Sequence, residues 1–334
     1  MRQRFFTLLA ILAVSFQCAL AQRLNVIFET DMGNDVDDAL AIDMLYKYHR
    51  SKKIDLMAIM LNKEGQYPPR FIDLLNRWYG CKRIPIGVTT RKKNSTMSHV
   101  QNFTEVVCKM KDEKGRPLYK QLPEGSENWQ DAVMLHRKLL AKAEDNSVTI
   151  ISVGFSNNLS ALLESQPDGF SPLSGKDLVA KKVDRLVVMA GHMENPNYRE
   201  FNVHHDIPAC QKVYNEWPTP IYTSPFELGE HILYPARSIS EDFGWTKHHP
   251  IVDAYKCYLP NMEDRPTWDL TAVLYAIDPG QMFSLSPAGR IHVTDRGCTT
   301  FKADATGNHY YLYTSPEQKK QILDYFVNMI TKKP

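Results

Sequence analysis

The 334-residue sequence predicts an α/β fold, a single domain with a central, mostly parallel β-sheet flanked by helices. Short apolar runs of strand length alternate with longer segments whose apolar residues recur at helical spacing. Neither an internal repeat nor a linker rich in Pro, Gly or Ser divides the chain. Polar residues cluster after several predicted strands, and ligands bind beyond the carboxyl ends of the strands in such sheets. These clusters therefore mark the region where a functional site is expected.

Each predicted strand is a short apolar run, beginning with residues 25–28. The predicted strands cover residues 25–28, 55–61, 84–88, 148–153, 185–189 and 220–223. Helices are predicted where apolar residues share a face, as Val36, Leu40 and Met44 do. The predicted helices cover residues 35–48, 69–80, 130–143, 157–164, 207–216, 269–277 and 315–331. Residues 90–128 are polar and are expected to be irregular, and the chain after residue 223 is expected to be mainly helical.

The beginning of the chain is typical of a signal peptide. Arg2 and Arg4 precede an apolar run over residues 5–20, and residues 19–21 read Ala-Leu-Ala, a small-x-small cleavage pattern. We expect residues 1–21 to be removed and residues 22–334 to form the mature domain, secreted or periplasmic. A membrane anchor is the alternative, but the run is short for one. No later run approaches about 20 apolar residues, so no membrane association is expected after cleavage.

The composition of the chain argues against several classes of partner and site. The net charge is +2 and no basic stripe is present, so nucleic acid is not expected as a partner. Loss of Cys18 with the signal peptide leaves five widely spaced cysteines, which fit neither a disulfide framework nor a zinc site. The sequence leaves the oligomeric state open, with a homo-oligomer as one alternative.

Five carboxylates follow the first predicted strand within the ten residues 29–38. They would repel one another if packed together, and carboxylate oxygens suit a hard divalent cation such as Ca²⁺ or Mg²⁺. Gly33 allows a tight turn, and Asp37 and Asp38 fall in the first turn of a helix, where the dipole favours negative charge. A solvated helix cap is the alternative. The segment is no EF-hand loop, because Ile42 stands where a Glu is required.

A strand followed by Asp-x-Asp-x-Gly-x-Asp-Asp and a helix is the signature of the calcium-dependent nucleoside hydrolases, the inosine-uridine preferring family, and this segment resembles it. The resemblance implies the Rossmann-related fold of that family. Two departures stand out. Glu29 occupies the place of the first Asp, and three residues rather than one separate Gly33 from Asp37. Asp35 belongs to this extra segment, and its role stays open.

Further segments resemble the family in the same order, over residues 26 to 280. Asn62 ends the second predicted strand, and residues 153–158 resemble a Gly-x-x-Thr-Asn turn after a strand. Residues 200–202 read Glu-Phe-Asn, and residues 265–269 precede an apolar helix as the family's late segment does. Each alone could be a turn or a helix cap.

The resemblance implies hydrolysis of the N-glycosidic bond of ribonucleosides to free base and ribose. It implies a Ca²⁺ ion that binds the ribose 2′- and 3′-hydroxyls and holds the attacking water. The implied metal ligands are Asp31, Asp38, Asp269 and the Val153 carbonyl, and Asp31 would accept the proton of the water. The residues implied to bind the sugar are Asp37, Asn62, Glu200 and Asn202.

Two other classes of function remain open at this point. One is a calcium-dependent nucleoside- or sugar-binding protein with lost or altered catalysis, which turnover would distinguish. The other is a metal-dependent phosphohydrolase. That activity needs a basic group to meet the phosphate, and only Arg199 and Arg265 are near the motifs.

Trp268 stands immediately before Asp269, where many nucleoside hydrolases carry a His that protonates the leaving base. Trp has no proton that titrates near neutral pH, so it cannot be a general acid. A Trp at this place is similar to the purine-preferring branch, and we interpret it as a platform that stacks on a purine, with simple packing as the alternative. Trp245 and Tyr258 are candidates for the opposite wall. His99 or His248 could supply a proton from a loop.

Overall fold

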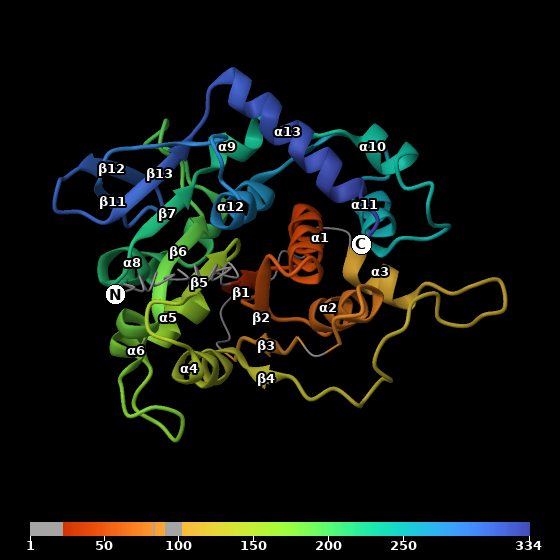
Figure 1. Cartoon of the computed structure of the whole chain (residues 1–334), viewed down its shortest axis with the longest axis horizontal. Helices are drawn as coiled ribbons and strands as arrows, with labels where there is room; N and C mark the ends of the chain where they lie inside the picture. The colour runs from red at the N-terminus through yellow and green to blue at the C-terminus, as the bar shows by residue number, and fades with distance from the viewer. Residues whose placement is uncertain (1–22, 83, 91–101) are drawn as a thin grey trace, which may run out of the picture.

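The computed structural model describes residues 23–82, 84–90 and 102–334 (Figure 1). The predicted signal peptide over residues 1–21 and the candidate proton donor His99 lie outside the described residues. In the described part of the chain, no helix is long and apolar enough to span a bilayer.

One large sheet forms the centre of the fold, in the order β12-β11-β13-β7-β6-β5-β1-β2-β3-β4, with β10 added beside β13. Its strands are β1 (Leu24–Thr30), β2 (Ile54–Leu61), β3 (Ile86–Val88), β4 (Gln130–Asp131), β5 (Val148–Ser152), β6 (Val183–Met189), β7 (Ile221–Ser224), β10 (Ser284–Leu285), β11 (Gly289–Val293), β12 (Thr299–Ala303) and β13 (His309–Tyr313). All pairings from β13 through β7 to β4 are parallel. Strand β5 is buried along its whole length, as expected for a parallel strand covered on both faces.

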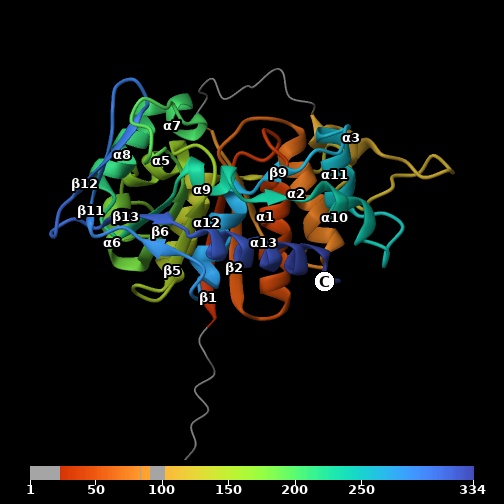
Figure 2. The ribbon, with the colours of Figure 1, turned by 90° about the horizontal axis from the view of Figure 1, so that it is seen from above.

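Helices cover both faces of the sheet. They are α1 (Asp37–Arg50), α2 (Tyr67–Trp78), α3 (Phe103–Lys109), α4 (Ala132–Lys142), α5 (Asn157–Glu164), α6 (Gly175–Lys182), α7 (Phe201–His205), α8 (Ile207–Glu216), α9 (Phe226–Glu230), α10 (Ala236–Glu241), α11 (Pro250–Tyr258), α12 (Trp268–Ile277) and α13 (Pro316–Thr331). Helices α1, α2, α11, α12 and α13 share one apolar core. Helices α4, α5, α6 and α8 share the other. Figure 2 shows α5, α6 and α8 on the opposite side of the molecule from α1, α2 and α11. The predicted α/β fold is confirmed.

The expectation of a mainly helical end is confirmed for α9 to α13 but wrong for residues 284–313, which form the four strands β10 to β13. The pattern that reveals a strand was present. In β11, Ile291 and Val293 are buried while Arg290 and His292 point outward, which is the two-residue period of a half-buried strand. The predicted irregular segment also contains α3, whose start is capped by the Asn102 side chain.

The carboxyl ends of the central strands meet at one edge of the sheet. Asp31 follows β1, Asn62 follows β2 and Val153 follows β5. Parallel pairing of β1 with both β2 and β5 brings these three positions together. A short two-stranded sheet of β8 (Leu233–Tyr234) and β9 (Arg265–Pro266) leads the chain into α12 and so to Asp269.

Candidate active site

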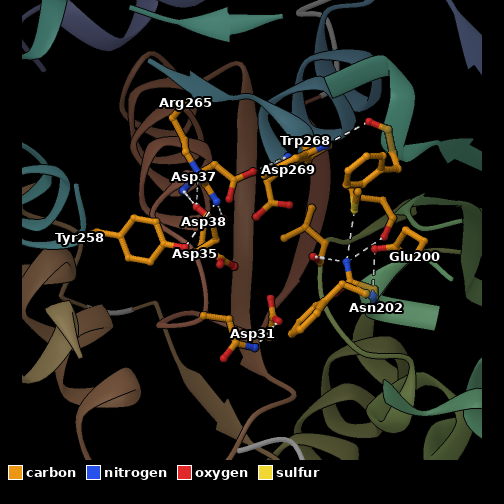
Figure 3. Close-up of a pocket in the computed structure, with 15 residues that line it drawn as sticks. Asp31, Asp35, Asp37, Asp38, Glu200, Asn202, Tyr258, Arg265, Trp268 and Asp269 are labelled. Atoms are coloured by element: carbon orange, nitrogen blue, oxygen red, sulfur yellow. Dashed lines mark hydrogen bonds and ion pairs between the residues drawn. The ribbon is translucent and has the colours of Figure 1, made fainter. Parts of the chain in front are cut away.

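A pocket of about 250 Å³ lies at this edge of the sheet (Figure 3). Segments distant in sequence form its walls: the acidic loop after β1, the end of β5, the residues around α7, and the region from Tyr258 to Asp269. Predicted site residues that line it are Asp31, Asp37, Asp38, Val153, Glu200, Asn202, Trp268 and Asp269. The structure therefore brings together eight of the nine residues that were predicted as metal ligands, sugar contacts or the stacking platform.

Three carboxylates form a buried group suited to a metal ion. Oxygens of Asp37, Asp38 and Asp269 lie within 4.8 Å of one another. The first two begin α1 and the third lies in the first turn of α12, and these two helices pack together. Burial raises the pKa of all three, and repulsion from neighbouring carboxylates of the acidic loop raises it further. A hard divalent cation fits this donor set, because it would offset both effects.

Asp31, predicted as a metal ligand and proton acceptor, lies on the pocket wall outside that group of three. Its Oδ2 accepts a hydrogen bond of 2.6 Å from Asn34 Nδ2. Asn34 Oδ1 in turn accepts from the Lys63 ammonium group. Burial raises the pKa of Asp31, and the positive charge of Lys63 opposes that rise. Sequence reasoning missed Lys63, although it directly follows Asn62 at the end of a strand.

Glu29, which stands where the family signature has its first Asp, is fully buried and does not line the pocket. Its Oε1 lies 2.6 Å from His136 Nε2, and its Oε2 accepts from Asn158 Nδ2 at 2.9 Å. The next residue, Thr30, donates its hydroxyl hydrogen bond to Asp38. Glu29 therefore ties β1 to α4 and α5, while Thr30 orients one carboxylate of the metal group.

Asn62 is the predicted site residue that the pocket does not include. It is fully buried, and both polar atoms of its amide lack a hydrogen-bond partner among the described residues. It lies against Gly154, where a Cβ would be 2.6 Å from Asn62 Oδ1 and 2.6 Å from the Asp31 nitrogen. Only glycine permits this approach. The sugar contact of Asn62 stays a prediction.

Glu200 and Asn202 form the pocket wall that faces Asp37 and Asp38 (Figure 3). The Glu200 carboxylate caps α7 and accepts from the backbone nitrogens of Asn202, Val203 and Gly191. Burial raises its pKa to about 7 despite these donors. Asn202 Nδ2 donates to the Val153 carbonyl at 3.0 Å, so this carbonyl and the predicted sugar-binding amide are neighbours.

Aromatic side chains line the remaining wall. The Trp268 ring stacks on Phe226 with centroids 5.2 Å apart, and its Nε1 donates to the Phe226 carbonyl at 3.0 Å. Tyr258 lines the same pocket, and its role as the opposite stacking wall stays a prediction. Trp245 does not line it, because its indole bonds to the Thr331 carbonyl at the end of α13. His248 lies in a different surface hollow, so neither residue contributes to the pocket.

The extra segment of the acidic loop carries an ion pair into the pocket. Arg265 Nε donates to Asp35 Oδ1 at 3.0 Å, and Arg265 Nη2 donates to Asp35 Oδ2. The centre of the guanidinium lies 5.3 Å from the centroids of both the Tyr258 and Trp268 rings. Asp35 is thus a partner of Arg265, outside the group that could hold a metal.

Comparison with known proteins points to one family. A family model described as inosine-uridine preferring nucleoside hydrolase matches residues 26–324. No curated protein matches the sequence. Among solved structures, a plant nucleoside hydrolase is 16% identical with a TM-score of 0.70, covering 93% of this chain and 100% of that one. A purine-preferring ribonucleoside hydrolase from Gardnerella vaginalis is 16% identical with a TM-score of 0.69, covering 92% and 98%. An inosine-uridine preferring nucleoside hydrolase from Bacillus anthracis is 14% identical with a TM-score of 0.67, covering 92% and 99%. At these identities the structural likeness shows a shared fold.

Proposed function

The chain belongs to the inosine-uridine preferring nucleoside hydrolase family, and from this premise we propose that it hydrolyses purine ribonucleosides to free base and ribose with the help of Ca²⁺. The family consists of hydrolases that act on N-glycosyl bonds of nucleosides. The observation that carries the proposal is the buried group of Asp37, Asp38 and Asp269 beside a pocket with polar residues on one wall and aromatic rings on another.

We assign each pocket residue a role from its position in the pocket. Asp31 is proposed to accept a proton from the attacking water, since it lies on the pocket wall next to the acidic group. Asn202 and Glu200 are proposed to hold the sugar hydroxyls. A divalent cation held by Asp37, Asp38 and Asp269 would coordinate sugar hydroxyls and lower the pKa of a water molecule. Asp37, which was predicted as a sugar contact, is thus proposed as a metal ligand. Asp31 keeps its predicted role as the base.

Purine preference is proposed from the aromatic wall. Trp268 and Phe226 present stacked rings to the pocket, and aromatic stacking on a base contributes roughly 1–3 kcal/mol. A purine offers two fused rings to this wall and a pyrimidine one. We therefore expect inosine, guanosine or adenosine to be cleaved faster than uridine or cytidine.

A panel of nucleosides with detection of free reducing sugar tests the proposal. Each nucleoside is incubated with the protein in Ca²⁺ and in excess chelator, beside its 2′-deoxy analogue. We expect turnover of purine ribonucleosides that chelator abolishes and that is much slower without the 2′-hydroxyl, because a site built to bind a hydroxyl discriminates strongly against its absence. Nucleoside binding without any release of base would instead make this a binding protein.

A further inference from the structure

Arg265 is the positively charged group beside the aromatic wall of the pocket, and the acidic loop holds it in a defined orientation. Its Nε and Nη2 both donate to Asp35, so the guanidinium is fixed along one edge. The Tyr258 hydroxyl lies 3.4 Å from Nη2 on the same side of the pocket (Figure 3). Arg265 Nη1 makes no hydrogen bond within the described part of the chain, although Arg265 lines the pocket.

Asp35 also explains how the positively charged Arg265 side chain can lie beside a metal site. The Arg265 charge lies close enough to Asp37 to lower that carboxyl's pKa. An unpaired guanidinium there would repel a bound divalent cation. The carboxylate of Asp35 neutralises it locally, and Asp35 is present in the loop because of the extra segment between Gly33 and Asp37.

Both Nη1 hydrogens of Arg265 are without a partner among the described residues, and the outer Nη2 hydrogen makes only a long contact of 3.4 Å with the Tyr258 hydroxyl, which a bound acceptor would displace. The two Nη groups together form the outer edge of the guanidinium. Such a planar fork matches two adjacent acceptors and is a poor match to an acceptor next to a donor. The O6 and N7 atoms of guanine are two adjacent acceptors, as they are in hypoxanthine, whereas adenine presents N7 beside an amino donor. Uracil and cytosine lack an adjacent acceptor pair on the corresponding edge.

We propose that Arg265, held by Asp35, is the specificity-determining residue of the leaving-group subsite and selects 6-oxopurines. This inference rests on the proposed function and deepens it. Arg265 is a donor of hydrogen bonds, and it keeps its protons throughout. When the C1′–N9 bond breaks, its electron pair goes to the base, and the water oxygen bonds to C1′ while its proton passes to Asp31. Asp31 releases that proton to solvent, and solvent supplies one to the base.

Hydrogen bonds to O6 and N7 stabilise the negative charge that develops on the departing purine. The subsite therefore acts both on the choice of base and on the rate of its departure. A substrate with an activated leaving group, such as p-nitrophenyl β-D-ribofuranoside, needs neither contribution.

The test compares Arg265→Gln, Arg265→Lys and Asp35→Asn with the wild type. The control is Arg237→Gln, which breaks an exposed ion pair with Glu241 on the surface. We measure kcat/KM for inosine, adenosine and the p-nitrophenyl riboside. Both Arg265 variants should lower the ratio of inosine to adenosine by about tenfold to a hundredfold, the effect of losing a bidentate contact. Asp35→Asn should give a smaller change in the same direction, because the guanidinium keeps its charge and loses its clamp.

The p-nitrophenyl riboside separates recognition of the base from damage to the site. Its kcat/KM should change little in both Arg265 variants and in Arg237→Gln, and an equal loss for this substrate and inosine in the Arg265 variants would overturn the proposal. An unchanged inosine-to-adenosine ratio in both Arg265 variants would also overturn it. So would a loss confined to nucleoside 5′-phosphates, which would place Arg265 at a phosphate instead.

A binding measurement decides the inference independently of turnover. Calorimetric titration of hypoxanthine and of adenine into the wild type and Arg265→Gln measures the subsite directly. Weaker binding of hypoxanthine alone in the variant supports the proposal, and equal affinities in both proteins refute it. If the wild type cleaves no nucleoside, the proposed function fails, and this titration still tests whether Arg265 binds the base.

Discussion

The carboxylate of Asp269 is buried beside those of Asp37 and Asp38, so its ionised form is unfavourable in the metal-free protein. We expect Asp269→Asn to raise the melting temperature of the metal-free protein at pH 8, because the neutral amide removes repulsion and keeps the shape. The same change should remove most of the stabilisation by Ca²⁺. A ligand at a hundred times its Kd contributes about 2.7 kcal/mol, which corresponds to several degrees.

Thermal unfolding in chelator and in saturating Ca²⁺ measures both effects. Asp278→Asn is the matched control, since Asp278 follows the other end of α12 and pairs with Lys53 at the surface. It should leave the Ca²⁺-dependent shift unchanged. An undiminished Ca²⁺-dependent shift in Asp269→Asn would show that this carboxylate holds no metal.

Trp268 forms the aromatic wall with Phe226. We expect Trp268→Ala to lower kcat/KM for purine nucleosides by about tenfold to a hundredfold, the equivalent of the roughly 1–3 kcal/mol of base stacking. Trp268→Phe should recover part of this loss because it retains a ring. Ca²⁺ should still raise the melting temperature of both variants. Full purine turnover by Trp268→Ala would make Trp268 a packing residue only.

Among the helices and strands, those that are defined by their own residues were predicted best from the sequence. Helices α5 and α8 begin and end at the predicted residues, because their apolar spacing and flanking residues define them without tertiary information. The acidic loop was recognised for the same reason, since its five carboxylates are close together in sequence. Strand β10 has only two residues, too few for a periodic pattern. Strands β11 to β13 were missed although β11 has the two-residue period of a half-buried strand, because that period was not recognised in a region expected to be helical.

The detailed geometry of the site depends on contacts that no local pattern contains. Asp35 and Arg265 are 230 residues apart, in segments that lead into α1 and α12, and these two helices pack together. The same packing places Asp269 beside Asp37 and Asp38. Asp31 lies next to this group, since its charge raises the pKa of Asp38, and it accepts a hydrogen bond from Asn34.

A buried ion pair links helix α1 to the end of α13. Lys47 Nζ lies 2.8 Å from Asp43 Oδ2 and also donates to the carbonyls of Met329 and Ile330. We expect Lys47→Met to destabilise the protein by about 3–5 kcal/mol, because a buried carboxylate loses its partner. The end of α13 also loses a donor for its terminal carbonyls. Urea unfolding gives this difference directly.

The double variant Asp43→Asn, Lys47→Met should be more stable than Lys47→Met alone, because it leaves no unpaired charge. Lys53→Met serves as a control. It breaks an exposed pair with Asp278, and surface pairs contribute about 0–1 kcal/mol. If the single and double variants were equally destabilised, the buried charge would not be the cause.

For the whole molecule, the site imposes a pH dependence on folding. Burial raises the pKa of Asp37, Asp38 and Asp269 well above the usual value, and raises that of Glu200 from 4.5 to about 7. Between about pH 4 and these raised values the four carboxyls keep protons in the folded protein that they have released in the unfolded chain. They therefore lower the free energy of unfolding as the pH rises through this window. Buried His249 and His309, whose pKa values are lowered to about 3 and about 4, act in the opposite direction only up to about pH 6.5, the ordinary pKa of a histidine. Surface carboxyls with lowered pKa values, such as Asp168 at about 2, titrate below this window.

We predict that the metal-free protein melts at a lower temperature at pH 8 than at pH 5, and that Ca²⁺ reduces or reverses this difference. The cation competes with protons for the same three carboxylates, so its stabilising effect should grow as the pH rises. Glu200 lies outside that group of three carboxylates, so part of the decrease in melting temperature, up to about pH 7, should persist when Ca²⁺ is saturating. Melting curves at intervals between pH 5 and 8, in chelator and in Ca²⁺, measure each part. In the metal-free Asp269→Asn variant the fall should be shallower, because one of the raised carboxyls is gone. A metal-free wild type that loses no stability between about pH 7 and pH 8, where His249 and His309 are neutral in the folded and the unfolded protein, would contradict the prediction.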